Sequence, residues 1–135
     1  MIKLIFPSIQ YQRELLQFKK DLLKSKSPFH GTGEIEKYPI DKWIERCDDH
    51  RSGLNLPAGY VPATLFMAVR TDNNKLVGLI QIRHSLNENL FRIGGNIGYV
   101  TAGDERIEVF SKEMLRLCLH ECKKLGMNKI LMTLH

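Results

Sequence analysis

The feature that most constrains the fold is a short, glycine-rich apolar segment that leads through a charged stretch into an amphipathic run. The segment is Gly94-Gly95-Asn96-Ile97-Gly98-Tyr99-Val100-Thr101, and the amphipathic run extends from Lys112 to Leu125. This order predicts a β-strand, a tight loop and an α-helix. A strand that leads directly into a helix leaves unpaired backbone N–H groups and the positive end of the helix dipole in one place. Because phosphate groups bind at such places, the order indicates a site for a nucleotide-type cofactor.

The predicted loop departs from the composition that phosphate-binding loops usually have. Such loops use glycine where the backbone approaches a diphosphate closely. Residues 107–111 read Ile-Glu-Val-Phe-Ser, so they contain no glycine and place the carboxylate of Glu108 near the expected anion. We therefore expect a cofactor site with an altered loop.

Length and composition predict one cored domain that spans residues 1–135, since 43% of the 135 residues are hydrophobic. No apolar run approaches the roughly 18 to 20 residues that span a bilayer, and the N-terminal apolar stretch is interrupted too soon for a signal peptide. We expect a cytoplasmic protein. The odd number of cysteines, Cys47, Cys118 and Cys122, shows no disulfide spacing, so free thiols are expected.

The net charge of +5 permits attraction to nucleic acid, to an acidic membrane or to a polyanionic cofactor. The lysine clusters lie on the polar sides of predicted amphipathic helices with acidic residues nearby, which is typical of a solvated helix face. The sequence has no interleaved aromatic and basic strand residues, no helix-turn-helix spacing and no zinc-finger pattern. We expect neither a nucleic-acid partner nor a membrane partner.

Periodicity predicts the order strand, helix, helix, three antiparallel strands, helix, strand. The predicted helices and strands after the first strand are a helix capped by Ser8 and ended by Ser25 to Pro28, a helix Ile40–Arg51, strands Leu65–Arg70, Leu76–Arg83 and Arg92–Thr101, a helix Lys112–Leu125 ended by Gly126, and a strand Lys129–Leu134. A strand, crossover helix and strand pack as parallel neighbours. The fold class is therefore α/β (α+β), with a mixed, mostly antiparallel sheet flanked by helices.

This order and four segments resemble the GNAT N-acetyltransferase superfamily over most of the chain. The segments that carry the resemblance are Val61-Pro62-Ala63-Thr64, Leu76-Val77-Gly78, Gly94 to Tyr99, and Glu113-Met114-Leu115-Arg116-Leu117. The resemblance implies a GNAT-like fold and the transfer of an acetyl group from acetyl-CoA to a primary amine. The acceptor, a small molecule or a peptide, is not readable from the sequence.

The resemblance also implies where acetyl-CoA binds. In the family, the strand that matches Tyr99, Val100 and Thr101 splays from its parallel neighbour and pairs with the pantetheine arm. The family's pyrophosphate loop, Arg or Gln, two residues, Gly, one residue, Gly or Ala, aligns on residues 106–111, namely Arg106, Ile107, Glu108, Val109, Phe110 and Ser111. Of the motif positions only the arginine matches. Val109 replaces the first glycine, and a positive φ there would cost about 1 to 3 kcal/mol.

The family usually continues past the strand that matches Lys129–Leu134 with a helix and two strands, and that part commonly carries a tyrosine that protonates the coenzyme A thiolate. This sequence stops at His135, so we expect a C-terminally truncated GNAT fold without an assignable general acid. The last strand is expected to leave an apolar sheet edge, which favours a homodimer through Lys129–Leu134.

Acetyl transfer also needs a donor to the thioester carbonyl and a route for the ammonium proton. The donor is expected to be a backbone N–H near Tyr99 or Val100. For the base, Glu105, Glu108 and His84 stay open, with Asn96 or Tyr99 as candidates that position a water, so no catalytic residue is assigned. An alternative is a catalytically inactive GNAT-fold protein that acts as a weak CoA-binding or protein-interaction module.

Three further groups of residues have both a functional and a structural interpretation. Cys118, His120, Cys122 and His135 contain zinc-binding residue types, but His120 lies about 200° around the helix from Cys118, so no metal site is predicted. Cys47 has no evident partner histidine as a nucleophile. Trp43 and Tyr38 are expected to lie either in the core or along an acceptor pocket.

Overall fold

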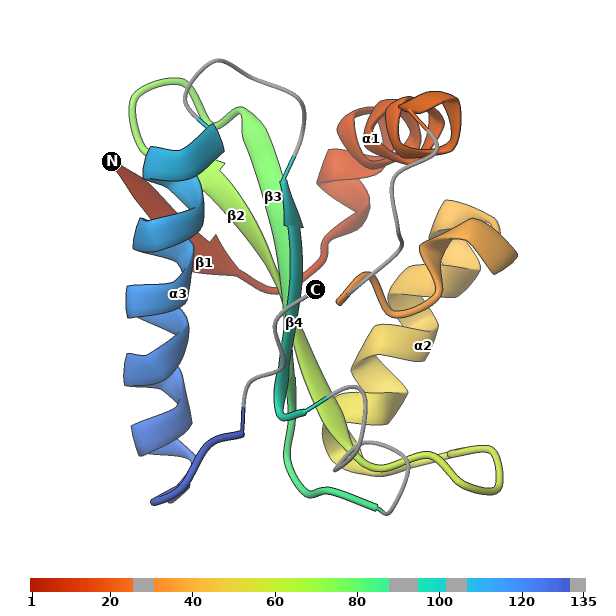
Figure 1. The fold of residues 1–135 in the computed structure, drawn as a ribbon. Coiled ribbons are helices and arrows are strands. Elements are labelled where there is room, and N and C mark those ends of the chain that lie inside the picture. Colours follow the sequence, from red (N-terminus) through yellow and green to blue (C-terminus); the bar gives the residue numbers. More distant parts are fainter. Residues whose placement is uncertain (26–30, 88–94, 102–106, 132–135) are drawn as a thin grey trace.

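The computed structural model describes residues 1–25, 31–87, 95–101 and 107–131 (Figure 1). The elements, in chain order, are β1 (Ile2–Ile5), the 3-10 turn η1 (Ile9–Tyr11), α1 (Gln12–Ser25), the 3-10 turn η2 (Ile35–Lys37), α2 (Ile40–Ser52), β2 (Ala63–Arg70), β3 (Leu76–Arg83), β4 (Ile97–Thr101) and α3 (Ile107–Lys124). The four strands form one sheet in the order β1-β2-β3-β4, and each pair of neighbours is antiparallel. The helices α1 and α2 cover one face of this sheet and α3 covers the other (Figure 1). The α+β prediction is confirmed.

Local sequence explains where most elements begin and end. The Ser8 hydroxyl accepts a hydrogen bond from the Gln10 N–H, so it caps the turn that leads into α1. Gly53 ends α2 in the left-handed conformation, with φ 74°. The predicted hairpin between β2 and β3 is confirmed, and Asn74 supplies a positive φ of 57° in its turn.

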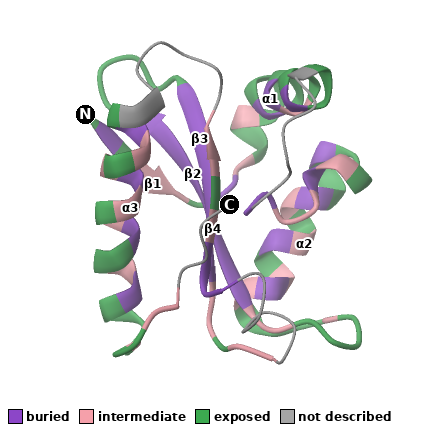
Figure 2. Ribbon diagram, viewed as in Figure 1, coloured by how far each residue is buried: buried purple, intermediate pink, exposed green. Residues whose placement is uncertain are grey.

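Alternation along β2 and β3 divides the core into two clusters, one on each face of the sheet (Figure 2). The cluster under α1 and α2 contains Leu15, Phe18, Leu22, Ile35, Ile40, Trp43, Cys47, Leu65, Met67, Val69, Leu76 and Leu79. The cluster under α3 contains Ile2, Phe66, Ala68, Val77, Ile80, Ile82, Ile97, Phe110, Met114, Cys118 and Cys122. Both faces are therefore closed by apolar packing over most of their length.

Two sequence-based boundaries are wrong. α3 begins at Ile107, five residues before the predicted Lys112, because Phe110 belongs to the same buried stripe as Met114 and Cys118. β4 begins at Ile97, and of the predicted strand before it only Gly95 and Asn96 are described, neither of them as strand.

The predicted strand Lys129–Leu134 is described only as far as Leu131, and residues 129–131 are not in strand conformation. The Asn96 N–H donates to the Leu131 carbonyl at 2.7 Å, and the Leu131 N–H donates to Asn96 Oδ1 at 2.9 Å. This segment thus runs beside the residue that precedes β4. Self-association through residues 129–134 stays a prediction.

No helix in the described part of the chain has the length and apolarity to cross a membrane.

Candidate functional site

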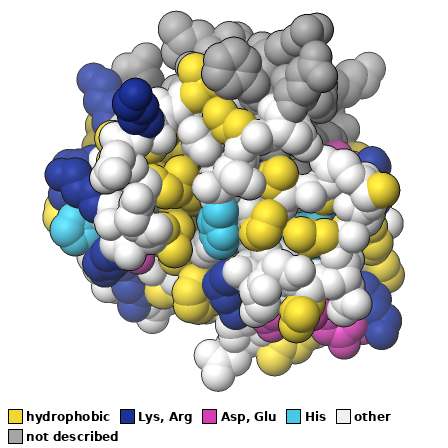
Figure 3. Space-filling view, turned by 90° about the horizontal axis from the view of Figure 1, so that it is seen from below, with side chains coloured by type: hydrophobic (Ala, Val, Ile, Leu, Met, Phe, Trp, Pro, Cys, Tyr) yellow, Lys and Arg dark blue, Asp and Glu magenta, His cyan; other side chains and the backbone are white. Residues whose placement is uncertain are grey.

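A cavity of about 320 Å³ lies where the start of β2 and the end of β3 meet the second half of α2. The residues that line it come from a loop before η2, from α2, from the connector that follows α2, from the two strands and from the segment after β3. They are Gly31, Thr32, Gly33, Glu34, Arg46, His50, Gly59, Tyr60, Val61, Ala63, Gln81, Arg83 and Asn87. Figure 3 views this end of the molecule, where hydrophobic side chains lie across the middle between basic side chains on both sides. The cavity interrupts the apolar packing of the α1/α2 face.

The loop Gly31–Gly33 forms the wall of the cavity next to β4. The Trp43 indole N–H donates to the Thr32 carbonyl at 2.8 Å, and Arg46 Nη1 donates to the Gly33 carbonyl at 3.1 Å. Gly31 has φ 65° and lies so close to β4 that a Cβ on it would be 2.0 Å from the Gly98 carbonyl oxygen. Only glycine fits there, and the contact places the cavity directly against β4.

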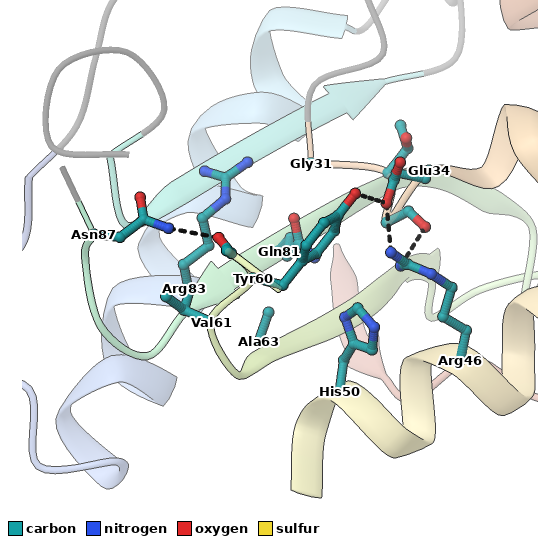
Figure 4. Close-up of a pocket in the computed structure, with 13 residues that line it drawn as sticks. Gly31, Glu34, Arg46, His50, Tyr60, Val61, Ala63, Gln81, Arg83 and Asn87 are labelled. Carbon is teal, nitrogen blue, oxygen red and sulfur yellow. Dashed lines mark hydrogen bonds and ion pairs between the residues drawn. The ribbon is translucent and has the colours of Figure 1, made fainter. Parts of the chain in front are cut away.

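A charged cluster closes the other side of the cavity (Figure 4). The Glu34 carboxylate is paired with Arg46, accepts a hydrogen bond from Lys37 at 2.6 Å, and accepts another from the Tyr60 hydroxyl at 2.8 Å. Burial alone would raise the pKa of the Glu34 carboxyl, but these donors and the charge of Arg46 outweigh it and hold that pKa below its usual value. The Arg46 guanidinium also stacks between the rings of Tyr38 and Tyr60, at 5.1 and 5.5 Å from their centroids.

His50 projects from α2 toward the cavity (Figure 4). It is 5% exposed, and its ring meets the Tyr60 ring edge-on at a centroid distance of 6.0 Å. Burial lowers the pKa of the His50 imidazole, and the nearby charge of Arg46 lowers it further, while Glu34 and Asp49 oppose the shift. The imidazole is therefore neutral at pH 7.

The floor of the cavity is formed by alternate residues of β3. Gln81 and Arg83 face the cavity, while Ile80 and Ile82 face α3. Arg83 Nη1 donates to the Gly95 carbonyl at 3.1 Å. Burial lowers the pKa of the Arg83 guanidinium, but arginine keeps its charge in proteins.

One edge of β4 is turned away from β3. The Arg83 N–H donates to the Asn96 carbonyl at 2.6 Å, and Gly98 is the register partner of Gln81. Because antiparallel pairing alternates, the N–H groups of Ile97, Tyr99 and Thr101 point away from β3. β4 spans five residues, about 17 Å, and Gly98, at the cavity wall, lies near its start (Figure 1).

The α3 N-terminus supplies the second half of a cofactor-binding surface. The N–H groups of residues 107–110 have no acceptor within α3, because the carbonyls four residues before them belong to residues that precede the helix. In the part of the chain that the structure describes, this strand edge pairs with no other strand. Together with the first amides of α3, such an edge fits an extended amide-containing arm that ends in a pyrophosphate.

One solved structure has the same arrangement of helices and strands. It is that of a Vibrio cholerae protein provisionally assigned as a ribosomal-protein-serine acetyltransferase, with a TM-score of 0.62 and 15% sequence identity. The fold is GNAT-like. The match covers 93% of this chain and 66% of the Vibrio cholerae chain, so the chain spans about two thirds of that protein's length. No protein-family model matches the sequence, and no curated protein matches it either.

In the GNAT-like fold, the predicted cofactor residues are those of β4, Arg106, and those at the start of α3. Tyr99, Val100 and Thr101 lie on β4 as predicted, with the Tyr99 side chain 39% exposed. Arg106 lies outside the described residues, and so do the side chains of Ile107 and Glu108. Whether these residues bind acetyl-CoA stays a prediction.

The predicted loop conformation of residues 107–111 is wrong, because these residues form the first turns of α3. Val109 is 54% exposed and is not among the described residues with positive φ, so the expected strain does not arise. Phe110 is 2% exposed and packs in the core, and Ser111 is half-buried. The amides that remain available are those of the first helical turn.

None of the described candidates for the base lies in the cavity. His84 lies on the α3 side of the sheet, where its Nε2 is 2.6 Å from the Thr64 hydroxyl. The Asn96 amide is occupied, since it donates to the Arg83 carbonyl at 2.9 Å and accepts from Leu131. Glu105 and the Glu108 side chain lie outside the described residues.

The cysteine and aromatic candidates are structural. Cys118 and Cys122 are fully buried against the sheet, and burial raises the pKa of both thiols. Their helix neighbour His120 is exposed, and His135 lies outside the described residues. Burial also raises the pKa of Cys47, to about 12, which makes it a poor nucleophile.

Of the aromatic candidates, Trp43 is fully buried, and it supports the cavity wall through the Thr32 carbonyl instead of lining the cavity. Tyr38 is half-buried and stacks on Arg46.

Sequence patterns did not identify the polar residues of the cavity, which are Glu34, Arg46, His50, Tyr60, Gln81 and Arg83. A signal existed for one of them. Trp43, Cys47 and His50 are spaced four and three residues apart, so they share the buried face of α2. A histidine on such a face is a polar residue at a buried position, which indicates a candidate functional group. The remaining residues come from segments far apart in the chain that no periodicity connects.

Proposed function

We propose that this chain is an acetyl-CoA-dependent N-acetyltransferase that acts on a primary amine. The observation that carries the proposal is the succession of three features: the N–H groups of the first turn of α3, the edge of β4 that pairs with no described strand, and the cavity that meets β4 at Gly31 and Gly98. The GNAT-like fold supports it. An acyl donor on β4 and an amine in the cavity would meet near Gly98.

The donor side uses backbone groups. The N–H groups of Tyr99 and Thr101 suit the amides of the pantetheine arm, and those of residues 107–110, with the helix dipole, suit the pyrophosphate. Acetyl-CoA supplies an activated acetyl group as a thioester. A backbone N–H of β4 near the cavity would polarise the thioester carbonyl. Leu131, hydrogen-bonded to Asn96, lies beside the start of β4.

The cavity is the proposed acceptor site. Its volume of about 320 Å³ suits a small amine or the first residues of a peptide. Its charged groups are largely satisfied internally, since the Glu34 carboxylate already has Arg46 and Lys37 as partners. The cavity is therefore a poor site for a polycationic acceptor. Because the name of the Vibrio cholerae protein refers to a serine of a ribosomal protein, a short serine peptide with a free primary amine is the first acceptor to test.

A catalytically inactive relative is the second candidate. The observation that favours it is Val109, whose exposed side chain lies in the turn where a glycine would admit a pyrophosphate most closely. Under this proposal the chain binds CoA weakly and serves as an interaction module.

Calorimetric titration with acetyl-CoA tests the donor site without knowledge of the acceptor, with desulfo-CoA as the non-reactive comparison. Binding with a micromolar Kd and one site per chain supports the enzyme. The absence of heat and of thermal stabilisation at millimolar ligand overturns it. Acetylation is then followed by mass spectrometry on short peptides with free N-termini and on small primary amines.

A double substitution, Val109→Gly with Ser111→Ala, separates the two candidates. If the side chains of the first turn impair the site, the double variant binds acetyl-CoA more tightly than the natural chain. A matched control is Leu119→Ala, which removes another exposed apolar side chain farther along α3. Equal tightening by the control would assign the effect to the helix surface in general.

A further inference from the structure

We propose that His50 is the general base that takes the proton from the acceptor ammonium in the cavity. The inference rests on the proposed acetyltransferase function. It assigns the proton-transfer step to a residue on α2, on the face of the sheet opposite His84.

The position of the imidazole is the first argument. His50 lines the cavity from α2, and its side chain points toward the space enclosed by Tyr60, Ala63 and Gln81 (Figure 4). Its ring is held edge-on against Tyr60. Among the described residues the imidazole nitrogens make no hydrogen bond, and neither nitrogen is completely shielded from solvent. An acceptor in the cavity can therefore reach an unoccupied nitrogen, directly or through one water.

The other titratable groups that line the cavity cannot accept a proton near neutral pH. Glu34 is held as a carboxylate by three donors, which makes it a very weak base. The Tyr60 hydroxyl donates to Glu34, and that hydrogen bond raises its pKa. Arg46 and Arg83 are permanent cations. Of the described lining residues, His50 is thus the one whose neutral form is both abundant and basic at pH 7.

The groups that face His50 keep it in this state. Arg46, one turn earlier on α2, disfavours protonation, whereas Glu34 from the η2 side and Asp49 on α2 favour it. Tyr60, from the connector after α2, contributes a neutral ring edge. Burial and Arg46 prevail, so the ring is a neutral acceptor with a pKa below that of free histidine.

The proposed acetyl transfer releases one proton overall. The acceptor enters as R–NH3⁺ and transfers one proton to the His50 imidazole. The freed lone pair of R–NH2 forms the C–N bond to the thioester carbonyl carbon, and the C–S bond breaks with its electrons on sulfur. The second nitrogen proton goes to the thiolate and gives CoA-SH. The imidazolium then loses its proton to water, and the products are R–NH–acetyl, CoA-SH and H⁺.

The kinetic test uses His50→Gln with acetyl-CoA and a short peptide with a free N-terminal serine. We expect a loss of about 10²-fold or more in kcat/KM at pH 7. The wild-type profile should rise with a midpoint below about pH 6.5, whereas the variant should rise only near the α-amino pKa of about 8. A variant that keeps the wild-type rate and the wild-type midpoint overturns the proposal.

Three controls make the result specific. His120→Gln alters an exposed histidine on α3 and should leave rate and profile unchanged. His84→Gln tests the alternative histidine, and loss of the low-pH midpoint in that variant with retention in His50→Gln would transfer the role to His84. His50→Ala should recover activity when free imidazole is added, which a purely structural role would not produce. Calorimetric binding of acetyl-CoA should be the same in all variants.

A readout without turnover keeps the inference testable on its own. The ring signals of the five histidines are followed by NMR in the full chain, with His50 assigned from the His50→Gln spectrum. His50 should titrate below about pH 6.5, and its signal should move when the serine peptide is added with desulfo-CoA. If no probe amine is acetylated, the acetyltransferase proposal fails. A His50 signal that does not move with the peptide, or that titrates like free histidine, overturns the proposal that His50 is the general base.

Discussion

The two faces of the sheet use the same strands for different purposes. Under α3, apolar side chains extend to the end of β3, where Ile80 and Ile82 pack against the helix. Under α1 and α2, the apolar layer stops at Leu79, and the next two residues on that face are Gln81 and Arg83. The difference begins within a single strand, since alternate residues of β3 point to opposite faces.

This contrast shows how a small chain can hold a polar cavity. The α3 face supplies a continuous dry core, so the α1/α2 face can lose apolar contact at one end without exposing the sheet. The cavity is stabilised instead by hydrogen bonds to the Thr32 and Gly33 carbonyls and by the charged cluster at Glu34. The two faces should therefore respond differently to substitution.

The largest expected effect is at the crossing of the Gly31 loop over β4. Gly31→Ala should destabilise the fold by about 4 kcal/mol, because the new Cβ would overlap the Gly98 backbone and the residue would keep a positive φ. The unfolding midpoint in urea measures the loss. Gly126→Ala is the control, since Gly126 also has a positive φ but has open space around it, and it should lose only about 1 kcal/mol. Equal losses in both variants would show that strain, not the crossing, sets the cost.

Much of the fold could be predicted from the sequence because its elements obey simple periodicities. β3 was placed at its observed bounds, and α2 to within one residue, since both are framed by turn residues or glycine. The start of α3 was missed although Phe110, Met114, Cys118 and Cys122 repeat every four residues. Residues 107–111 also align with a phosphate-binding loop, and that alignment predicts a later helix start than the apolar repeat does.

The cavity could not be predicted in the same way. Glu34 and Tyr60 are 26 positions apart and lie in loops, where no period relates one residue to another. Glu34 has a left-handed backbone conformation, with φ 61°, and its carboxylate pairs with Arg46. Glutamate rarely adopts this conformation, so the residue type does not predict it. His50 alone carried a readable signal, because it falls on the buried stripe of α2.

The α3 face of the sheet should be more sensitive to loss of apolar volume than the α1/α2 face. Met114 is fully buried over Gly78, so Met114→Ala should cost about 3 kcal/mol through lost contacts and a residual void. Thermal and urea unfolding report the change. Leu119→Ala, on the exposed side of the same helix, should change stability by less than about 1 kcal/mol. A loss at Leu119 as large as that at Met114 would contradict the assignment of the buried face.

The α1/α2 face should lose stability when a charge is removed rather than when apolar volume is removed. Glu34→Gln removes the counter-charge of Arg46, whose side chain is 12% exposed, and should cost about 1 to 2 kcal/mol at pH 7. Because the folded-state pKa of Glu34 is lowered, its contribution is present above about pH 4.3 and is lost as the pH falls through the folded value. The wild-type and variant stabilities should converge as the pH falls below about 4.3, and a constant difference would contradict the pairing.

The smallest expected effect compares one histidine on each face. Burial lowers the pKa of both His50 and His84. Each is neutral in the folded state at pH 7, so neither disfavours folding there. As the pH falls below about 6.5, the unfolded chain binds protons that the folded chain does not, and stability declines until the pH passes the folded value. His50→Gln and His84→Gln should each flatten part of this decline in urea unfolding between pH 7 and pH 5, by less than about 1 kcal/mol.

The two histidines are thus alike in what they do to folding. They differ in what surrounds them, because His84 is bonded to Thr64 whereas His50 faces the cavity. If both variants flatten the decline and only His50→Gln alters acetyl transfer, then the cavity, and not the shifted pKa, makes a histidine functional in this fold.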